Sequence, residues 1–360
     1  MKKRLLILLL IVIVILLTVG AVFYIMMSRP AYKPGVLSER DDLQAFTKPP
    51  SQQGTEKGYW QIDDKTKIYH FAEGKGKPVL VIHGGPGIPT FQPWEGLQQV
   101  EGYRFYYYHQ RGCGKSTHPF NEFKSKNYYS NMTALIDKLG MEQQIADIER
   151  IRKILDREKI TIIGHSYGGF IATLYAIEFP QHVEKMILVS PAGVLRLPPD
   201  DDGMAGIKKH LSDERKEDFD DWFKKYFDYG KIFTKSEKGL ANLNTEYGEF
   251  YLEAAKRKGI NVPLHIERES EQADQIGGWM VHAIYLSLGR KYDYRNKLEK
   301  IAAPSLVIHG KEDLYPASMS KEYARLIPDS KLEIISGAGH FAFDEEPEHF
   351  ARLVQEFLGD

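Results

Sequence analysis

A serine between two glycines is the stretch of this sequence with the clearest potential for chemistry. Gly164–Gly168 reads glycine, any residue, serine, any residue, glycine; it follows the β-branched run Lys159–Ile163 and precedes the apolar stretch Phe170–Phe179. Strand, motif and helix in that order predict a sharp turn that projects Ser166 out of a sheet as a nucleophile. A glycine-rich turn with an incidental serine is the alternative, so partners for the serine have to be found elsewhere.

Residues that could activate Ser166 lie much later in the sequence. A serine hydroxyl is a weak nucleophile, so it needs a general base, and the base needs a carboxylate that orients it. Asp313 and His340 each follow a short strand-like run on a loop. Since reactive groups gather at the carboxyl ends of parallel strands, we expect Ser166, Asp313 and His340 to form a catalytic triad. Glu312 and Asp293 remain alternative acids, although neither is as well placed.

The same chemistry requires donors for the negative oxygen that develops in the transition state. Backbone amides suit this role because they are already oriented. One amide should come from Tyr167, directly after the serine, and another from the loop His83–Gly87, which follows an earlier strand-like run. Within that loop we favour Gly85 over Gly84. Taken without the triad, the loop would be read as an ordinary tight turn.

Strand-like and helix-like segments alternate on both sides of these residues. Continuous apolar runs are expected of strands that are buried on both faces. Val79–Ile82, Arg104–Tyr108 and Met186–Val189 are read in this way, and Lys159–Ile163, Ser305–Ile308 and Lys331–Ile335 are further strand-like segments. Their alternation with segments of helical spacing predicts an α/β fold with a mostly parallel, doubly wound sheet. Residues 57–194 and 298–360 would form this core.

The middle of the chain, residues 195–297, has a different character. Strand-like runs vanish there, and aromatic, charged and helix-forming residues dominate. One aromatic segment contains Trp222, Phe223, Tyr226, Phe227 and Tyr229. We expect residues 195–297 to form a mostly helical cap that is inserted into the core and sits over the sheet.

Residues 1–28 predict a transmembrane anchor. Leu5–Met27 is almost wholly apolar and, at about 1.5 Å per residue, can cross a hydrocarbon core of about 30 Å. The basic residues Lys2–Arg4 before it favour a cytoplasmic N-terminus and a catalytic domain outside the cytoplasm. Small residues at Val19–Ala21 would also fit a cleavage site, so a cleaved signal peptide and a secreted domain are the alternative. Residues 29–56, with several prolines and glycines, would form a linker.

Composition excludes several other classes of protein. Of 360 residues, 42% are hydrophobic and 27% charged, and the net charge of −1 gives no reason to expect nucleic acid as a partner. The single cysteine, Cys113, rules out an internal disulfide framework. The histidines lack metal-ligand spacing, so neither a metal nor another cofactor is expected. Gly112–Ser116 ends like a phosphate-binding loop, but His109 stands where that pattern needs glycine.

Several of these motifs together resemble the proline-iminopeptidase branch of the α/β-hydrolases. They are His83–Gly87, Gln110–Ser116, Gly164–Gly169, Gly310–Asp313 and Gly339–His340. The resemblance runs from about residue 58 to the C-terminus. It implies that Ser166, Asp313 and His340 are the triad, that Gly85 and Tyr167 supply the oxyanion hole, and that a helical cap is inserted between strands.

The chain departs from that family's pattern in two respects, the second of which concerns the substrate. The family usually has aspartate before Gln-Arg-Gly, where this chain has His109. Iminopeptidases also recognise a free N-terminal amine through carboxylates of the cap. By type and region alone, the candidates here are Glu246, Glu249, Glu269 and Glu271. A run of charge on a cap helix is usually a solvated face.

The sequence therefore predicts a membrane-tethered serine hydrolase that works through an acyl-enzyme. The leading hypothesis is a proline-iminopeptidase-like aminopeptidase on short peptides. An esterase or lipase on small acyl esters is the alternative. A catalytically silent binding protein on the same fold is a third hypothesis, from a different class. The expected partners are a small-molecule or short-peptide substrate and the membrane.

Overall fold

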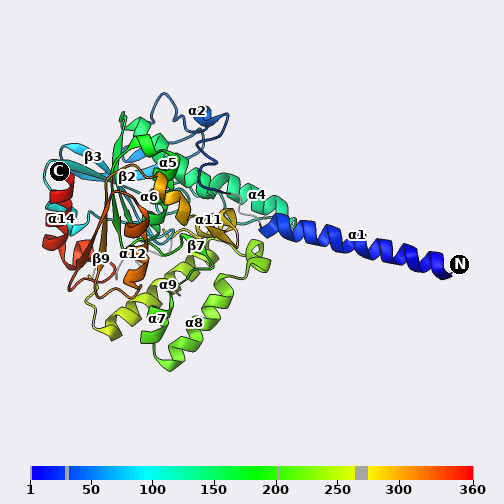
Figure 1. Cartoon of the computed structure of the whole chain (residues 1–360). Coiled ribbons are helices and arrows are strands. Elements are labelled where there is room, and N and C mark those ends of the chain that lie inside the picture. The colour runs from blue at the N-terminus through cyan, green and yellow to red at the C-terminus, as the bar shows by residue number, and fades with distance from the viewer. Residues whose placement is uncertain (1, 29–31, 201–202, 264–274, 360) are drawn as a thin grey trace.

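An eight-stranded sheet organises the computed structural model, which describes residues 2–28, 32–200, 203–263 and 275–359 (Figure 1). The strand order is β1-β2-β4-β3-β5-β6-β9-β10. These strands are β1 (Tyr59–Gln61), β2 (Lys67–Gly74), β3 (Lys77–Ile82), β4 (Tyr103–Tyr108), β5 (Ile160–His165), β6 (Val183–Val189), β9 (Ser305–Gly310) and β10 (Ser330–Ile335). Every pair from β4 to β10 is parallel, whereas β1 with β2 and β2 with β4 are antiparallel. The prediction of a mostly parallel sheet is confirmed.

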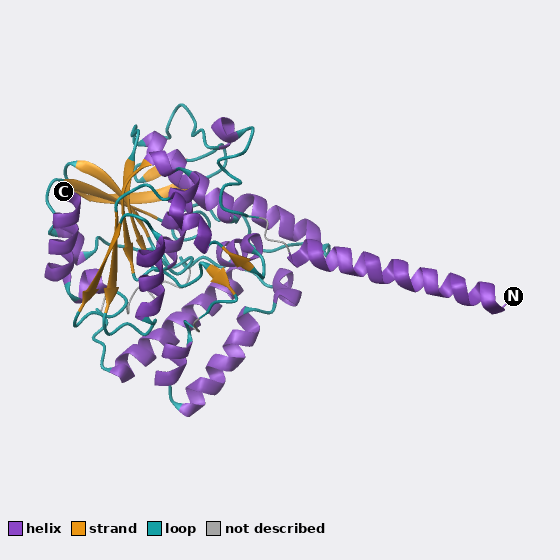
Figure 2. Ribbon diagram, in the orientation of Figure 1, coloured by secondary structure: helices purple, strands orange, loops and turns teal. Residues whose placement is uncertain are grey.

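Helices cover both faces of this sheet (Figure 2). The α-helices are α1 (Lys2–Ser28), α2 (Leu43–Phe46), α3 (Glu95–Gln98), α4 (Tyr128–Leu139), α5 (Met141–Ile154), α6 (Tyr167–Glu178), α7 (Ala205–His210), α8 (Asp213–Tyr226), α9 (Glu237–Lys258), α11 (Trp279–Leu288), α12 (Ala317–Leu326), α13 (Ala342–Glu345) and α14 (Pro347–Gly359). Short 3₁₀ turns lie at Pro180–His182, Tyr229–Thr234 and Arg295–Lys300, and β7 (Arg196–Leu197) pairs with β8 (Tyr292–Asp293) apart from the main sheet.

Two apolar cores explain why the central strands read as continuous apolar runs. On β3, Leu80 and Ile82 join the larger core with α5 and α6, while Val79 and Val81 join the second core with α3 and α14. Successive side chains of a strand point to opposite faces, so a strand covered on both sides must be apolar throughout. The strands are thus held from both faces, which fixes the carboxyl ends where the site lies.

The segment between β6 and β9 is helical, as expected. It contains α7, α8, α9 and α11, and α8 and α9 each begin at a serine whose side chain accepts a backbone N–H of the first turn. α9 ends at Gly259, whose φ of 85° is the left-handed conformation that terminates helices. α11 packs against α4 of the core. The bounds 195–297 for a cap stay a prediction.

At the N-terminus, α1 extends away from the rest of the molecule (Figure 1). Within it, Leu6–Tyr24 has a mean hydropathy of 3.4 and none of that stretch is buried. A helix of this length and composition fits either a membrane span or a signal sequence.

The predicted linker contacts the body over part of its length. Tyr32 and Leu37 are fully buried, and the Tyr32 amide donates to the Ser287 carbonyl over 2.8 Å. Glu178 at the end of α6 accepts hydrogen bonds from the Tyr32 hydroxyl and from the amides of Gly35 and Ser38. A buried carboxylate needs such partners, and it holds this segment to the core.

Candidate active site

Ser166 occupies the sharp turn between β5 and α6. Its φ of 52° and ψ of −120° lie outside the regions that ordinary residues favour. The amide of Ser166 donates to the Val189 carbonyl over 2.9 Å, and its carbonyl accepts from Ala192 over 3.0 Å. A Cβ at Gly168 would overlap the carbonyls of β3, which is why this turn needs glycine. The neighbouring strands therefore hold the strained serine in place.

Asp313 and His340 lie together at the ends of β9 and β10. His340 Nδ1 is 2.8 Å from Asp313 Oδ2, and the other carboxylate oxygen accepts the Tyr315 amide over 3.0 Å. Burial alone would raise the pKa of Asp313, but the charge and hydrogen bond of His340 outweigh it and leave the pKa below its ordinary value. The aspartate therefore stays ionised and fixes the proton of His340 on Nδ1. This leaves the Nε2 atom of His340 able to accept a proton.

The two alternative acids are less well placed. Asp293 is exposed and forms an ion pair with Arg295, with 2.8 Å between Oδ1 and Nε. Glu312 is the neighbour of Asp313, but it is the Asp313 carboxylate that lies 2.8 Å from His340 Nδ1. The geometry thus favours Asp313 over both.

His165, which sequence reasoning left unassigned, supports the loop that carries His340. Its Nε2 lies 3.0 Å from the His340 carbonyl. Burial, followed by the nearby His340 ring, lowers the pKa of His165 well below its ordinary value. A neutral His165 with its proton on Nε2 can donate to that carbonyl. Its position inside the serine motif was the signal that could have identified it.

The loop after β3 brings two glycines against the serine. A Cβ at Gly84 would lie 2.8 Å from Ser166 Cβ, and Gly85 has a φ of 108°, which a side chain would strain. Tyr167 is the first residue of α6, where backbone N–H groups have no partner within the helix. Gly85 and Tyr167 therefore border the serine from two elements.

A buried histidine fixes the direction of the peptide that precedes Gly85. His83 Nε2 accepts the Gln110 amide over 3.1 Å, so its proton lies on Nδ1, 2.9 Å from the Gly84 carbonyl. The carbonyl and N–H of a trans peptide point in opposite directions, so this bond also orients the Gly85 amide. Burial lowers the pKa of His83 to about 4, which keeps the ring neutral. Gln110, in the Gln-Arg-Gly motif, thus positions the loop indirectly.

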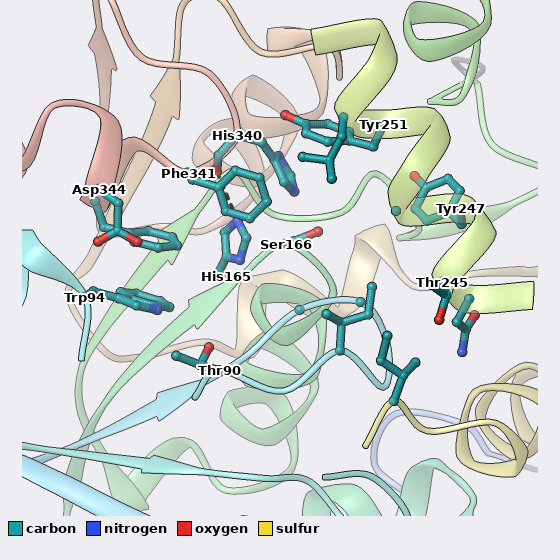
Figure 3. A pocket seen from close by; sticks show the side chains of 18 of the residues that line it. Thr90, Trp94, His165, Ser166, Thr245, Tyr247, Tyr251, His340, Phe341 and Asp344 are labelled. Carbon is teal, nitrogen blue, oxygen red and sulfur yellow. Dashed lines mark hydrogen bonds between the residues drawn. The ribbon is translucent and has the colours of Figure 1, made fainter. Parts of the chain in front are cut away.

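Two cavities share Ser166 and His340 in their lining, and Figure 3 shows the smaller of them. Their volumes are about 120 Å³ and about 500 Å³. Both are lined by Gly85, Ile88, Ser166, Asn244, Tyr247, Tyr315 and His340. Two of these residues, Asn244 and Tyr247, come from α9, so the helical insertion contributes to the lining beside Ser166. No sequence pattern indicated the lining residues of α9.

Carboxylates are scarce around these cavities. Among the described lining residues, Asp344 in the smaller cavity is the single carboxylate, and its Oδ1 accepts the Glu95 amide over 2.7 Å. Glu246 and Glu249 are exposed on α9 and do not line either cavity. Glu269 and Glu271 lie outside the described residues. Asp344 is a candidate that sequence reasoning missed.

The described part of the chain contains no group of histidine, cysteine and acidic residues that could hold a metal. Cys113 is buried, and burial raises the pKa of its thiol well above the ordinary value. It lies 3.6 Å from His83 Nε2 behind the glycine loop. Its environment is that of a packing residue.

Comparison with known proteins finds curated proteins of similar sequence and solved structures of similar fold. The proline iminopeptidase of Heyndrickxia coagulans is 26% identical over 298 residues, which cover 79% of this chain and 91% of that protein. The proline iminopeptidase of Saccharolobus solfataricus is 26% identical over 317 residues, which cover 84% of this chain and 92% of that protein. Among solved structures, an esterase from Exiguobacterium antarcticum aligns with a TM-score of 0.58 at 21% identity, covering 85% of this chain and 100% of that one. At that identity the likeness concerns the fold.

A family model described as the alpha/beta hydrolase fold matches residues 77–347. This span includes the strained serine at the end of β5, the aspartate after β9 and the histidine after β10. The curated relatives confirm the resemblance that the glycine loop, the Gln-Arg-Gly segment and the serine motif indicated. The chain belongs to the α/β-hydrolase fold family and is similar to its proline-iminopeptidase branch.

Proposed function

We propose that this hydrolase acts through an acyl-enzyme on Ser166. His340 takes the proton of the serine hydroxyl as Oγ attacks an ester or amide carbonyl, and returns it to the leaving group. Water then attacks the acyl-enzyme, with the same histidine as the base. Asp313 orients the imidazole throughout, and the amides of Gly85 and Tyr167 stabilise the negative oxygen.

The Asp313–His340 contact is the observation that carries this proposal. The two side chains come from different strand ends, yet Oδ2 and Nδ1 are 2.8 Å apart, and the histidine borders both cavities beside Ser166. Burying an ionised carboxylate costs free energy unless a partner such as an imidazole compensates for the lost hydration. Its position opposite a strained serine fits an acid that orients a base.

For the substrate, we propose the N-terminal proline bond of short peptides as the leading candidate. The proline iminopeptidases that match most of the chain, and the motifs shared with that branch, support it. Asp344 supports it further, because a carboxylate in the smaller cavity could pair with the charged amine of an N-terminal proline.

An ester of an apolar acyl group is the second candidate. A specific observation favours it: the larger cavity has no described carboxylate, and its lining is mostly aromatic and aliphatic. Such a lining suits an acyl group better than a charged amine.

The test has two parts. Labelling of Ser166 by a fluorophosphonate, lost in Ser166→Ala, is expected; a folded protein that is not labelled would contradict the hydrolase proposal. A panel of proline arylamides against nitrophenyl esters then separates the two substrates. Blocking the amine of the proline substrate should abolish its turnover. The variant Asp344→Asn should lose most of its turnover of the unblocked substrate. If neither change affects turnover, recognition of the amine by this cavity is wrong.

We also propose that α1 spans the membrane with its N-terminus in the cytoplasm and the catalytic domain outside. The unburied apolar stretch and the basic residues before it support this orientation. Secretion after cleavage near Val19–Ala21 is the alternative. Residues 57–194 and 298–360 would form the catalytic core, and residues 195–297 the cap that covers it.

A further inference from the structure

Several rings that line the larger cavity use their polar groups within the protein, whereas the buried hydroxyls of Tyr167 and Tyr229 have no hydrogen-bond partner among the described residues. Trp222 Nε1 donates to the Leu243 carbonyl over 2.7 Å, and the Tyr226 hydroxyl donates to Asn244 over 2.8 Å. The hydroxyls of Tyr247 and Tyr315 bond to each other. The ring faces that remain toward the cavity are hydrophobic. A ligand with many polar groups, such as an extended peptide backbone, would find few hydrogen-bond partners in this lining to replace those it makes with water.

The size of this cavity exceeds what a proline ring needs. Its volume of about 500 Å³ lies within the range of whole small-molecule pockets, roughly 300–1,000 Å³. Besides Ser166, its lining includes Met132, Leu286 and Arg290, and Arg290 is the only one of its described lining residues with a permanent charge. Arg290 is exposed, so the cavity has a charged rim at that end.

This rim lies next to the membrane anchor along the chain and in space. The cavity residues Leu286 and Arg290 flank Ser287, whose carbonyl accepts the Tyr32 amide over 2.8 Å. α1 ends at Ser28, four residues earlier, and four residues span at most about 14 Å. The rim is therefore close to the end of the apolar helix.

The exposed side chains around this rim are suited to a lipid surface. Lys33, directly after Tyr32, and Lys291, directly after Arg290, are both exposed. Basic side chains beside a membrane helix are attracted to anionic lipid headgroups. They would hold the rim against the bilayer if α1 spans it.

From these observations we propose that the larger cavity takes the acyl chain of an ester that resides in the membrane, and that the chain enters from the lipid past Arg290. This inference rests on the proposed serine chemistry and specifies its ester substrate. The Ser166 hydroxyl would form an ester bond to the acyl group as the alcohol leaves with the proton from His340. Water then cleaves that bond and releases a fatty acid, so no other reactant is needed.

The first experiment varies the length of the acyl chain, with full-length protein in vesicles and nitrophenyl acetate, butyrate and octanoate as substrates. Each buried methylene contributes about fourfold in binding, so kcat/KM should rise by on the order of 100-fold from butyrate to octanoate. Met132→Trp, which fills the cavity from α4, should lower octanoate turnover at least tenfold more than it lowers acetate turnover. The matched control Ala134→Trp, at an exposed position of α4, should behave as the wild type. Equal rates for all chain lengths, or equal losses for both esters in Met132→Trp, would overturn the proposal.

A second experiment separates the two sources of substrate. An ester lipid is placed in the same vesicles as the protein or in separate, protein-free vesicles. Faster turnover in the shared vesicles is expected, and equal rates would overturn entry from the membrane.

Binding without turnover distinguishes failure of this inference from failure of the serine chemistry. Ser166→Ala should bind dodecanoate more tightly than butyrate by calorimetry, and Met132→Trp in that background should remove the difference. If no ester is hydrolysed and no phosphonate labels Ser166, the chemistry fails, while selective dodecanoate binding would still support the cavity. If acetate is hydrolysed but dodecanoate is bound no better than butyrate, the cavity inference alone fails.

Discussion

At the scale of single residues, the site depends on groups held in unfavourable states by their neighbours. Ser166 has a positive φ, and Asp313 is an ionised carboxylate at 7% exposure. Each state costs about 1–3 kcal/mol or more unless the surroundings compensate for it. The backbone hydrogen bonds at Ser166 and the imidazole at Asp313 supply that compensation. Residues of this kind are expected where geometry serves a reaction.

Replacing the carboxylate while keeping its shape tests its role. Asp313→Asn should lower kcat by about 10⁴ at pH 7, because the amide favours the wrong tautomer of His340. Binding of substrate should change much less. The measurement is steady-state kinetics with circular dichroism to check folding. Glu312→Gln is the matched control. If that variant loses most of its activity while Asp313→Asn keeps it, Glu312 and not Asp313 orients His340.

Glu345 should make the stability of the protein depend on pH. Burial raises the pKa of this carboxyl from 4.5 to about 7, although it accepts the Gly339 amide on the loop of His340. Between these values the folded protein holds a proton that the unfolded chain has released, so the free energy of unfolding should fall as pH rises. Above pH 7 the ionised carboxylate remains buried at a cost.

Glu345→Gln removes that titration. We compare the free energy of unfolding of this variant with that of the wild type at two pH values. The difference should favour the variant by about 2 kcal/mol more at pH 8 than at pH 5. Urea unfolding in detergent micelles measures it. Glu346→Gln, at the next position, should show no such change. A difference from the wild type that is the same at both pH values would contradict the raised pKa.

At the scale of elements, the sequence was most informative where two faces are buried. The apolar runs at Val79–Ile82 and Met186–Val189 predicted strands because each face meets its own core. The order of the motifs likewise predicted which strand ends carry Ser166, Asp313 and His340. Residues 29–56 were less readable, because a proline-rich segment has no periodicity and its partner, Glu178, lies 146 positions beyond Tyr32.

Glu178 should control whether that segment stays on the body. Glu178→Gln replaces one acceptor oxygen with an amide that faces a backbone N–H, so at least one hydrogen bond is lost at a buried position. A loss of about 1–3 kcal/mol in stability is expected, with faster hydrogen exchange over residues 32–47. Glu184→Gln, exposed on β6, is the control. Unchanged exchange in Glu178→Gln would mean that Leu37 and its neighbours hold the segment without this carboxylate.

At the scale of the whole molecule, the site lies between the core, whose site residues the sequence predicted, and the helical insertion, whose lining residues it did not predict. The proposed nucleophile, base and acid lie at strand ends of the core, where local motifs indicated them. Much of the remaining lining of the cavities comes from α8, α9, α11 and the segment after β6, where side chains meet through tertiary packing alone. Amphipathic helices show which face is buried, but not which residues across the chain they meet. For this reason Glu246 and Glu249 were chosen by type, whereas Asn244 and Tyr247 line the site.

The anchor gives the last prediction, which concerns the state of the mature protein. If α1 spans the membrane, the intact chain beginning near Met1 should resist extraction by alkaline carbonate. Protease added to intact cells from the outer side should reach the catalytic domain but not the basic N-terminus. Mass spectrometry of the N-terminal peptide provides the decisive measurement. A mature protein that begins after Ala21 and is found in the medium would establish secretion, and it would also remove the lipid surface that the rim at Arg290 is proposed to meet.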